Sequence, residues 1–160
     1  MKIDETLYTT KPDAEGRLVK EMAVYDLLEE LEIPFTRVDH EVTPSIDSCE
    51  GVDQLLGIKI CKNLFLCNRQ KTDFYLLLMP GDKSFRTREL SAQIGSARLS
   101  FANEEYMEEL MDLTPGSVTV MGLMNDKDRK VRLLVDKEVA ESEYMGCHPC
   151  INTSSLKVRT

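Results

Sequence analysis

Apolar residues recur along this chain with two different spacings. Between residues 17 and 31 they return every three or four positions, which predicts one apolar face of a helix that Pro34 would end. Elsewhere they alternate with polar residues or form short runs, which is typical of strands. The run 74–79 is apolar on both faces and therefore predicts a central, buried strand.

Capping residues and turn formers separate the other expected elements. A hairpin is expected between the 58–66 and 74–79 strands because only a short polar linker joins them. Helices and strands are mixed without strict alternation, so we expect an α+β (mixed α/β) single domain around one sheet, after a flexible N-terminal arm at residues 1–15. The expected helices are 17–31, 47–56, 87–94 and 104–111; the expected strands are 35–40, 58–66, 74–79, 99–101, 118–120 and 130–136; residues 144–156 are expected to form a loop, with Val158 in a last strand.

The 58–66 strand carries a lysine among aliphatic residues. Alternation places Lys62 on the same face as Leu64 and Leu66, where its ammonium would lie at the edge of an apolar layer. A lysine is rarely buried without a partner. Two interpretations follow: a strand-end lysine whose stem covers apolar surface while its head reaches water, or a lysine that binds an anionic ligand.

Composition and charge narrow the class of protein. The formal net charge of −8 argues against indiscriminate binding to polyanions such as DNA. Basic residues nevertheless dominate the segment 59–88, while acidic residues dominate the segment 25–53. This distribution suits a local anionic ligand, such as one end of a nucleic acid, or simply a soluble surface. No apolar run is long enough for a membrane helix or a secretory signal, so a cytoplasmic protein without a membrane partner is expected.

Five cysteines and two histidines offer little material for a metal or redox centre. Cys147 and Cys150 have the C-x-x-C spacing, but a zinc site usually needs further ligands and the remaining candidates are scattered. A surface or capping role is expected for His40. No motif of a nucleotide-binding loop, a serine hydrolase or a zinc peptidase is present. An enzyme of this sequence would thus act by positioning a reactive substrate, such as an activated ester, without a metal, a cofactor or a covalent nucleophile.

Three short motifs resemble one known family in both order and spacing. They are the K-N-L-F-L run at 62–66, the P-G-S-V-T turn at 115–119 and the G-C-H-P-C-I-N-T segment at 146–153. Together they resemble the YbaK and prolyl-tRNA synthetase-associated editing domains, over residues 16–160, and most of all the free-standing deacylases of Ala-tRNA(Pro). The resemblance implies a mostly antiparallel, curved sheet flanked by helices.

The resemblance also implies a reaction and a set of site residues. The reaction would be hydrolysis of alanine from the acceptor end of mischarged tRNA(Pro), with help from the substrate's own 2′-hydroxyl group, and prolyl-tRNA synthetase would be a further partner. A second, smaller sieve is physically reasonable because a site for proline rejects a smaller side chain only weakly. The implied catalytic residues are Lys62, Gly116 and His148; the implied substrate-binding residues are Ile46, Asn63, Ser117, Gly146, Asn152 and Thr153.

Alternatives remain open at this point. The family's P-G-S-V-T turn often continues with Pro-Phe, whereas Val120 and Met121 follow here, so the preferred amino acid could instead be cysteine or serine. A module that binds tRNA or a synthetase without catalysis would fit the same residues. A metal or redox protein built on Cys147 and Cys150 is the third alternative.

Overall fold

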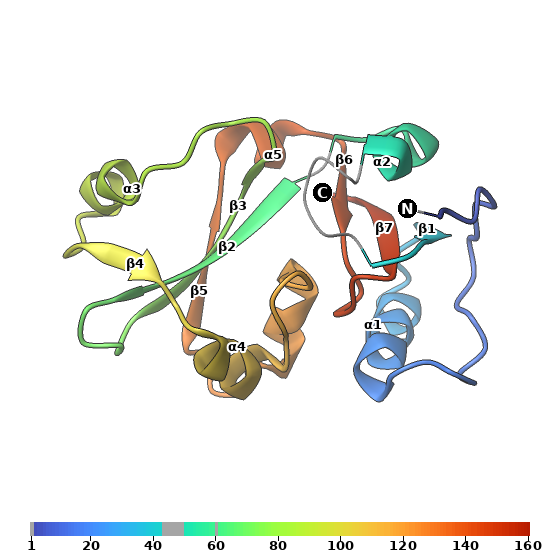
Figure 1. Ribbon diagram of the computed structural model, residues 1–160, viewed down its shortest axis with the longest axis horizontal. Coiled ribbons are helices and arrows are strands. Elements are labelled where there is room, and N and C mark those ends of the chain that lie inside the picture. The colour runs from blue at the N-terminus through green and yellow to red at the C-terminus, as the bar shows by residue number, and fades with distance from the viewer. Residues whose placement is uncertain (1, 43–49, 60) are drawn as a thin grey trace.

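The strands of this protein form two sheets. The computed structural model describes residues 2–42, 50–59 and 61–160, and its larger sheet has the order β4-β2-β3-β5 while its smaller sheet has the order β1-β7-β6. Figure 1 shows the two sheets next to each other, with α3 at the outer end of the larger one. The strands are β1 (Phe35–Asp39), β2 (Cys61–Asn68), β3 (Phe74–Pro80), β4 (Leu99–Phe101), β5 (Val131–Val135), β6 (Tyr144–Cys147) and β7 (Ser154–Arg159).

The helices flank these sheets. A C′ glycine in the left-handed conformation ends α3 at Gly95, and the Asn103 side chain accepts a hydrogen bond from Tyr106 N at the start of α4. The end of α3 and the start of α4 therefore agree with the helix bounds expected from the sequence. The helices are α1 (Val19–Glu30), α2 (Glu50–Leu56), α3 (Thr87–Ile94), α4 (Glu104–Met111), the 3-10 helix η2 (Val120–Asn125) and α5 (Lys137–Glu141).

Strand pairing confirms the predicted hairpin. β2 and β3 are antiparallel neighbours, β4 is antiparallel to β2, and β5 is parallel to β3. The smaller sheet is wholly antiparallel. The predicted class, a mixed α+β domain flanked by helices, is confirmed. The expectation of one sheet is wrong, because β1, β6 and β7 pair only with one another among the described strands.

One apolar core joins the two sheets. It combines Phe65 and Leu76 of the larger sheet with Leu156 of the smaller sheet, and α1 and α4 close it. A second cluster lies on the other face of the larger sheet, under α3, and a third connects α2 with β1. The shared core explains why the two sheets form a single domain.

Two local predictions are wrong. The strand expected at 118–120 is absent, and η2 begins at Val120. Within η2, Gly122 packs closely against Leu113 and Met111 at the end of α4, where a Cβ would overlap the Leu113 side chain. Residues 144–156 are not wholly a loop: β6 and the start of β7 lie within them.

The N-terminal residues 2–15 contain no helix or named strand. They make two isolated backbone bridges to the smaller sheet, Ile3 with His40 and Tyr8 with Arg37. The outer edge of β1 is thereby covered. Among the described residues, no helix has the length and apolar character needed to cross a membrane.

Candidate functional site

Strand β2 presents two faces with different surroundings. Leu64 and Leu66 belong to the apolar cluster under α3. Because side chains alternate, Cys61 and Asn63 point to the opposite face, toward the smaller sheet. This opposite face, defined by Cys61 and Asn63, is called the cavity face below.

A small cavity lies between the cavity face of β2, α2 and the smaller sheet. Its volume is about 20 Å³, on a measure by which one water molecule needs about 10–15 Å³. Such a space accepts roughly one methyl-sized group. It is lined by Val52, Asp53, Leu56, Ile58, Cys61, Asn63, Gly146, Cys147, His148 and Ser155. Three of the residues predicted for the site, Asn63, Gly146 and His148, therefore meet here.

Asn63 brings an unsatisfied acceptor to the cavity. Its side-chain oxygen is buried and has no hydrogen-bond partner within the part of the chain that the structure describes. Buried polar atoms nearly always find a partner, and leaving one unpaired costs roughly 1–3 kcal/mol. An N–H donor on a ligand in the cavity would supply that partner.

Gly146 gives the cavity its shape. It lies in β6, and a Cβ at this position would overlap the side chain of Ile58. Ile58 itself lines the cavity. Any larger residue at 146 would therefore push Ile58 into this space or move the strand.

His148 follows β6 and is partly buried. Its Nδ1 donates to the carbonyl oxygen of Ser154 at 2.9 Å, so the lone pair lies on Nε2. Burial lowers the pKa of His148, and the nearby His40 ring acts in the same direction. The ring is consequently neutral at pH 7, and Nε2 can accept a proton or a hydrogen bond.

Lys62 lies on the other face of β2 and does not line the cavity. Its Nζ donates to the carbonyl oxygen of Lys83, in the turn that follows β3. Among the described residues, Lys62 is therefore not part of the lining that Gly146 and His148 share with Asn63. Lys83 lines a second, larger hollow, and Lys62 is bonded to its carbonyl without lining that hollow itself.

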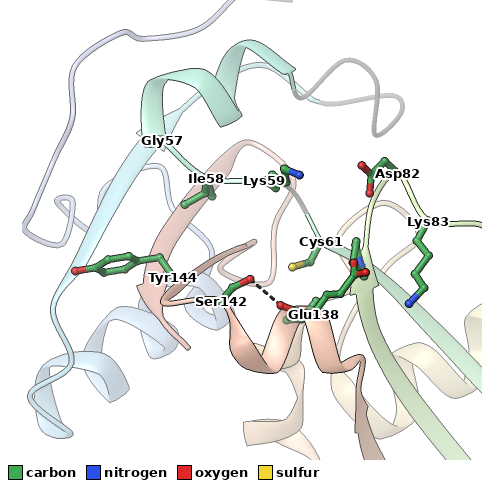
Figure 2. A pocket seen from close by; sticks show the side chains of 11 residues that line it. Gly57, Ile58, Lys59, Cys61, Asp82, Lys83, Glu138, Ser142 and Tyr144 are labelled. Atoms are coloured by element: carbon green, nitrogen blue, oxygen red, sulfur yellow. Dashed lines mark hydrogen bonds between the residues drawn. The ribbon is translucent and has the colours of Figure 1, made fainter.

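The larger hollow is an open cleft of about 680 Å³ beside the cavity. Figure 2 shows it between the end of α2, the turn after β3 and α5, with the Cys61 thiol near its centre and Tyr144 on the far wall. Ile58 and Cys61 line both the cleft and the cavity, so the two spaces are adjacent. The cleft wall is braced at α5, where the Ser142 hydroxyl donates to Glu138 O at 2.8 Å.

The P-G-S-V-T turn and the 148–154 segment meet outside the cavity. Gly116 has a φ of +88°, and a Cβ there would lie 3.2 Å from Asn152 Nδ2.

Two other predicted residues have structural roles in these segments. Ser117 is buried and its hydroxyl donates to Thr114 O at 2.8 Å, which holds the turn together. Thr153 is exposed, and its carbonyl accepts from His40 N. None of these residues lines the cavity.

The C-x-x-C cysteines are buried in the core. Burial raises the pKa of both Cys147 and Cys150 to about 12, so both thiols are protonated at pH 7. Thiolates, not thiols, act as nucleophiles and metal ligands. In the described part of the chain, no group of three or more His, Cys, Asp or Glu side chains is placed to hold a metal ion.

Sequence reasoning missed part of the site. Ile46 lies outside the described residues, so its predicted role stays a prediction. Cys61 and Ser155 line the cavity without having been predicted. Alternation along β2 was the available signal for Cys61, because it shares the face of Asn63. Nothing local indicates Ser155, which reaches the cavity through the pairing of β7 with β1 and β6.

Comparison with known proteins gives one family. The sequence matches the aminoacyl-tRNA editing domain over residues 43–160. It is 31% identical over 134 residues to the prolyl-tRNA editing protein ProX of Acetoanaerobium sticklandii, covering 84% of this chain and 82% of that protein. It is 29% identical over 136 residues to the prolyl-tRNA synthetase associated domain-containing protein 1 of Danio rerio, covering 83% of this chain and 73% of the relative.

A solved structure shares the fold. It is described as a candidate trans-editing enzyme for prolyl tRNA synthetase, and it superposes with a TM-score of 0.66 at 16% identity. The superposition covers 88% of this chain and 86% of the other. The likeness confirms the fold expected from the three motifs.

Proposed function

Because this chain belongs to the aminoacyl-tRNA editing domain family, the family and enzyme class expected from its motifs, we propose that it hydrolyses the ester of mischarged tRNA(Pro), with Ala-tRNA(Pro) as the preferred substrate. The observation that carries this proposal is the cavity beside Asn63 and His148. It is small, mostly apolar, and adjacent to an open cleft.

The size of the cavity supports alanine. A space of about 20 Å³ among the described residues suits a methyl group better than the larger ring of proline. Exclusion by clash discriminates strongly, whereas a synthetase that must accept proline rejects alanine only through lost contacts, worth about 1–3 kcal/mol. The cavity therefore acts as the smaller of two sieves. Ile46 remains a proposed wall of it.

Asn63 supports recognition of the amino group. An aminoacyl ester carries an ammonium group next to its carbonyl carbon, and the Asn63 side-chain oxygen is a buried acceptor without a partner among the described residues. A bond between the two would satisfy the asparagine and fix the ester beside the cavity.

His148 supports the proton transfer. Its neutral ring, held through Nδ1 on Ser154 O, offers Nε2 to the attacking water or to the substrate's 2′-hydroxyl group. Gly116 is proposed to place backbone N–H groups near the ester: its own N–H has no acceptor among the described residues. Ser117, Asn152 and Thr153 hold the two loops that carry these groups.

The terminal adenosine of the tRNA is proposed to bind in the cleft. Its volume of about 680 Å³ suits a nucleoside, and it adjoins the cavity through Ile58 and Cys61. The exposed Lys59 lines the cleft, and Lys62 donates to the carbonyl of Lys83, which also lines it; both lysines bring positive charge to a protein of net charge −8. Both are proposed to contact phosphate or ribose, with an affinity that falls as salt is raised.

A deacylation panel tests the proposal. Purified protein is incubated with Ala-, Ser-, Cys- and Pro-tRNA(Pro), and release of each amino acid is followed over time. The proposal predicts the fastest release from Ala-tRNA(Pro) and the slowest from Pro-tRNA(Pro). Faster release from the Ser or Cys ester would reassign the substrate. If no amino acid is released above the buffer control, while a related deacylase is active in parallel, the proposed deacylase activity is refuted. The alternative of a module that binds tRNA without catalysis would then be favoured.

Three further proposals follow from the same function. Residues 16–160 are proposed to form the editing domain, with residues 1–15 as a separate arm. The acceptor end of tRNA(Pro) is the proposed partner, with prolyl-tRNA synthetase as a second proposed partner and no part for DNA or a membrane. The cytoplasm is the proposed location.

A further inference from the structure

A cluster of charged side chains lies where α1, β1 and β7 meet. Arg17 precedes α1 and Glu21 lies within it, while Arg37 and Asp39 lie on β1. Glu21 is 1% exposed and Arg37 is 3% exposed. Charges this deeply buried are retained only when they are paired and hydrogen-bonded, and the proposed reaction uses none of them directly.

Asp39 is the centre of this cluster. Its carboxylate accepts from Arg17 Nη2 at 3.1 Å and also from Arg37 Nη1. The other carboxylate oxygen accepts from the Ser154 hydroxyl at 2.6 Å. Burial alone would raise the pKa of Asp39, but these donors outweigh it and lower the pKa to about 2. The carboxylate is therefore charged, and it holds Ser154 firmly, at any neutral pH.

Ser154 connects this cluster to the site. Its hydroxyl donates to Asp39 and accepts from Arg17 Nη1 at 3.3 Å, and these two hydrogen bonds fix the orientation of the side chain. Its carbonyl oxygen accepts the Nδ1–H of His148 at 2.9 Å. Asp39 and Ser154 are also paired residues in the β1–β7 ladder. The position of the Ser154 carbonyl thus depends on both the strand pairing and the carboxylate.

We infer that Asp39 is a positioning residue for His148, acting through Ser154, with Arg17 and Arg37 holding its carboxylate in place. The inference rests on the proposed deacylase function and adds a component to it. Asp39 fixes the carbonyl of Ser154, that carbonyl selects the Nδ1–H tautomer of His148, and Nε2 is left as the acceptor at the cavity. No proton moves through Asp39.

The test compares Asp39→Asn with wild type by two measurements. The first is ¹⁵N NMR of the histidine ring nitrogens, which reports the tautomer of His148 without any tRNA. The second is deacylation of Ala-tRNA(Pro) at saturating and limiting substrate. Asparagine keeps the size of the side chain but loses the charge. We expect a mixed tautomer at His148 and a fall in kcat of about tenfold or more, with KM within about twofold.

Two controls separate positioning from simple loss of stability. Leu90→Ala opens the apolar cluster under α3, on the face of the sheet away from the cavity, and it lowers stability without touching Ser154 or His148. Asp26→Asn removes an exposed carboxylate whose hydrogen bond joins Lys11. Both controls should keep the wild-type tautomer and kcat at a temperature where they are folded.

The outcomes are distinct. An unchanged His148 tautomer in Asp39→Asn, with kcat equal to that of Leu90→Ala, overturns the inference. If Asp39→Asn does not fold, Ser154→Ala takes its place, because it removes the hydroxyl link while Asp39 keeps both arginines. If the wild-type protein has no deacylase activity, the proposed function fails, yet the tautomer measurement still decides whether Asp39 positions His148.

Discussion

The two faces of β2 have different surroundings: one packs against apolar side chains under α3, and the other borders a cavity. On one face, Leu64 and Leu66 pack under α3 in a cluster whose buried members are apolar. On the cavity face, Cys61 and Asn63 meet Gly146 and His148 around a space of about 20 Å³. Farther along the same face, Phe65 belongs to the main core, so only the start of β2 lines the proposed binding site while the rest of the strand stabilises the domain.

This difference shows how alternation distributes function. Lys62 and Asn63 are adjacent in sequence, yet the Lys62 amine bonds the carbonyl of Lys83 in the turn after β3, while the Asn63 side chain places a buried oxygen beside the cavity. A short motif such as K-N-L-F-L thus serves two surfaces at once. Lys62 is suited to the anionic end of the substrate, and Asn63 to the amino acid.

The largest expected effect comes from removing the acceptor on the cavity face. His148→Ala should lower kcat for Ala-tRNA(Pro) by about 10²-fold or more, the usual range for loss of a group that transfers a proton. Single-turnover deacylation measures this. Leu90→Ala, on the apolar face, should lose stability but keep its kcat while folded. Equal losses of kcat in both variants would remove the distinction between the faces.

Gly146→Ala should fill the cavity from within. The added methyl group overlaps Ile58, so either the cavity closes or β6 shifts. Overpacking of this kind costs about 1–3 kcal/mol of unfolding free energy. Thermal unfolding and deacylation are measured together, with Gly95→Ala, at the C-cap of α3, as a glycine control distant from the cavity. Wild-type activity in Gly146→Ala would place the amino acid elsewhere.

Acid should lower the stability of the domain through the ionic cluster around Asp39, whereas the apolar cluster under α3 has no part in this loss. The folded pKa of Asp39, about 2, lies below the ordinary value of an aspartate, near 3.8, so its stabilisation is complete above about pH 4 and is lost as the pH falls toward 2. The lost contribution is about 2 kcal/mol. Unfolding free energies between pH 2 and pH 5 measure it. An identical acid profile in Asp39→Asn would contradict the assignment.

The smallest change in activity is expected from substitution of a cysteine of the C-x-x-C pair. Burial raises the pKa of Cys150 to about 12, so its thiol is neither a nucleophile nor a ready metal ligand at pH 7. Cys150→Ala should change kcat by less than about threefold and lower stability by about 1 kcal/mol. Native mass spectrometry should find the protein without zinc. Loss of activity together with loss of a bound metal would revive the alternative of a metal protein.

Local signals predicted much of the fold. Gly95 and Asn103 mark helix ends through their own conformation and side chain, so the end of α3 and the start of α4 are as expected. The start of α3 is not, because Thr87 was expected to cap the helix and instead lies in its first turn, after Arg86. Strand β6 could not be found in this way, because its four residues pair only with β7, and a short Gly-containing segment reads as a loop until its partner is known. The division into two sheets is likewise a matter of distant pairing.

The sequence named some of the residues that line the cavity but did not indicate their arrangement. The motifs identified Asn63, Gly146 and His148, which the structure brings together. They could not indicate that the Lys62 amine would bond the Lys83 carbonyl, because that depends on the turn after β3. The ionic cluster around Asp39 also left no signal, since its members are spread from Arg17 to Ser154.

The most direct test of the central claim compares Lys62→Ala with Asn63→Ala. Single-turnover hydrolysis of Ala-tRNA(Pro) is measured over a range of enzyme concentrations and at two salt concentrations. The account predicts that Asn63→Ala lowers the rate even at saturating enzyme, while Lys62→Ala mainly weakens binding and reduces its dependence on salt. A normal saturating rate in Asn63→Ala, with a rate lost at every concentration in Lys62→Ala, would contradict it.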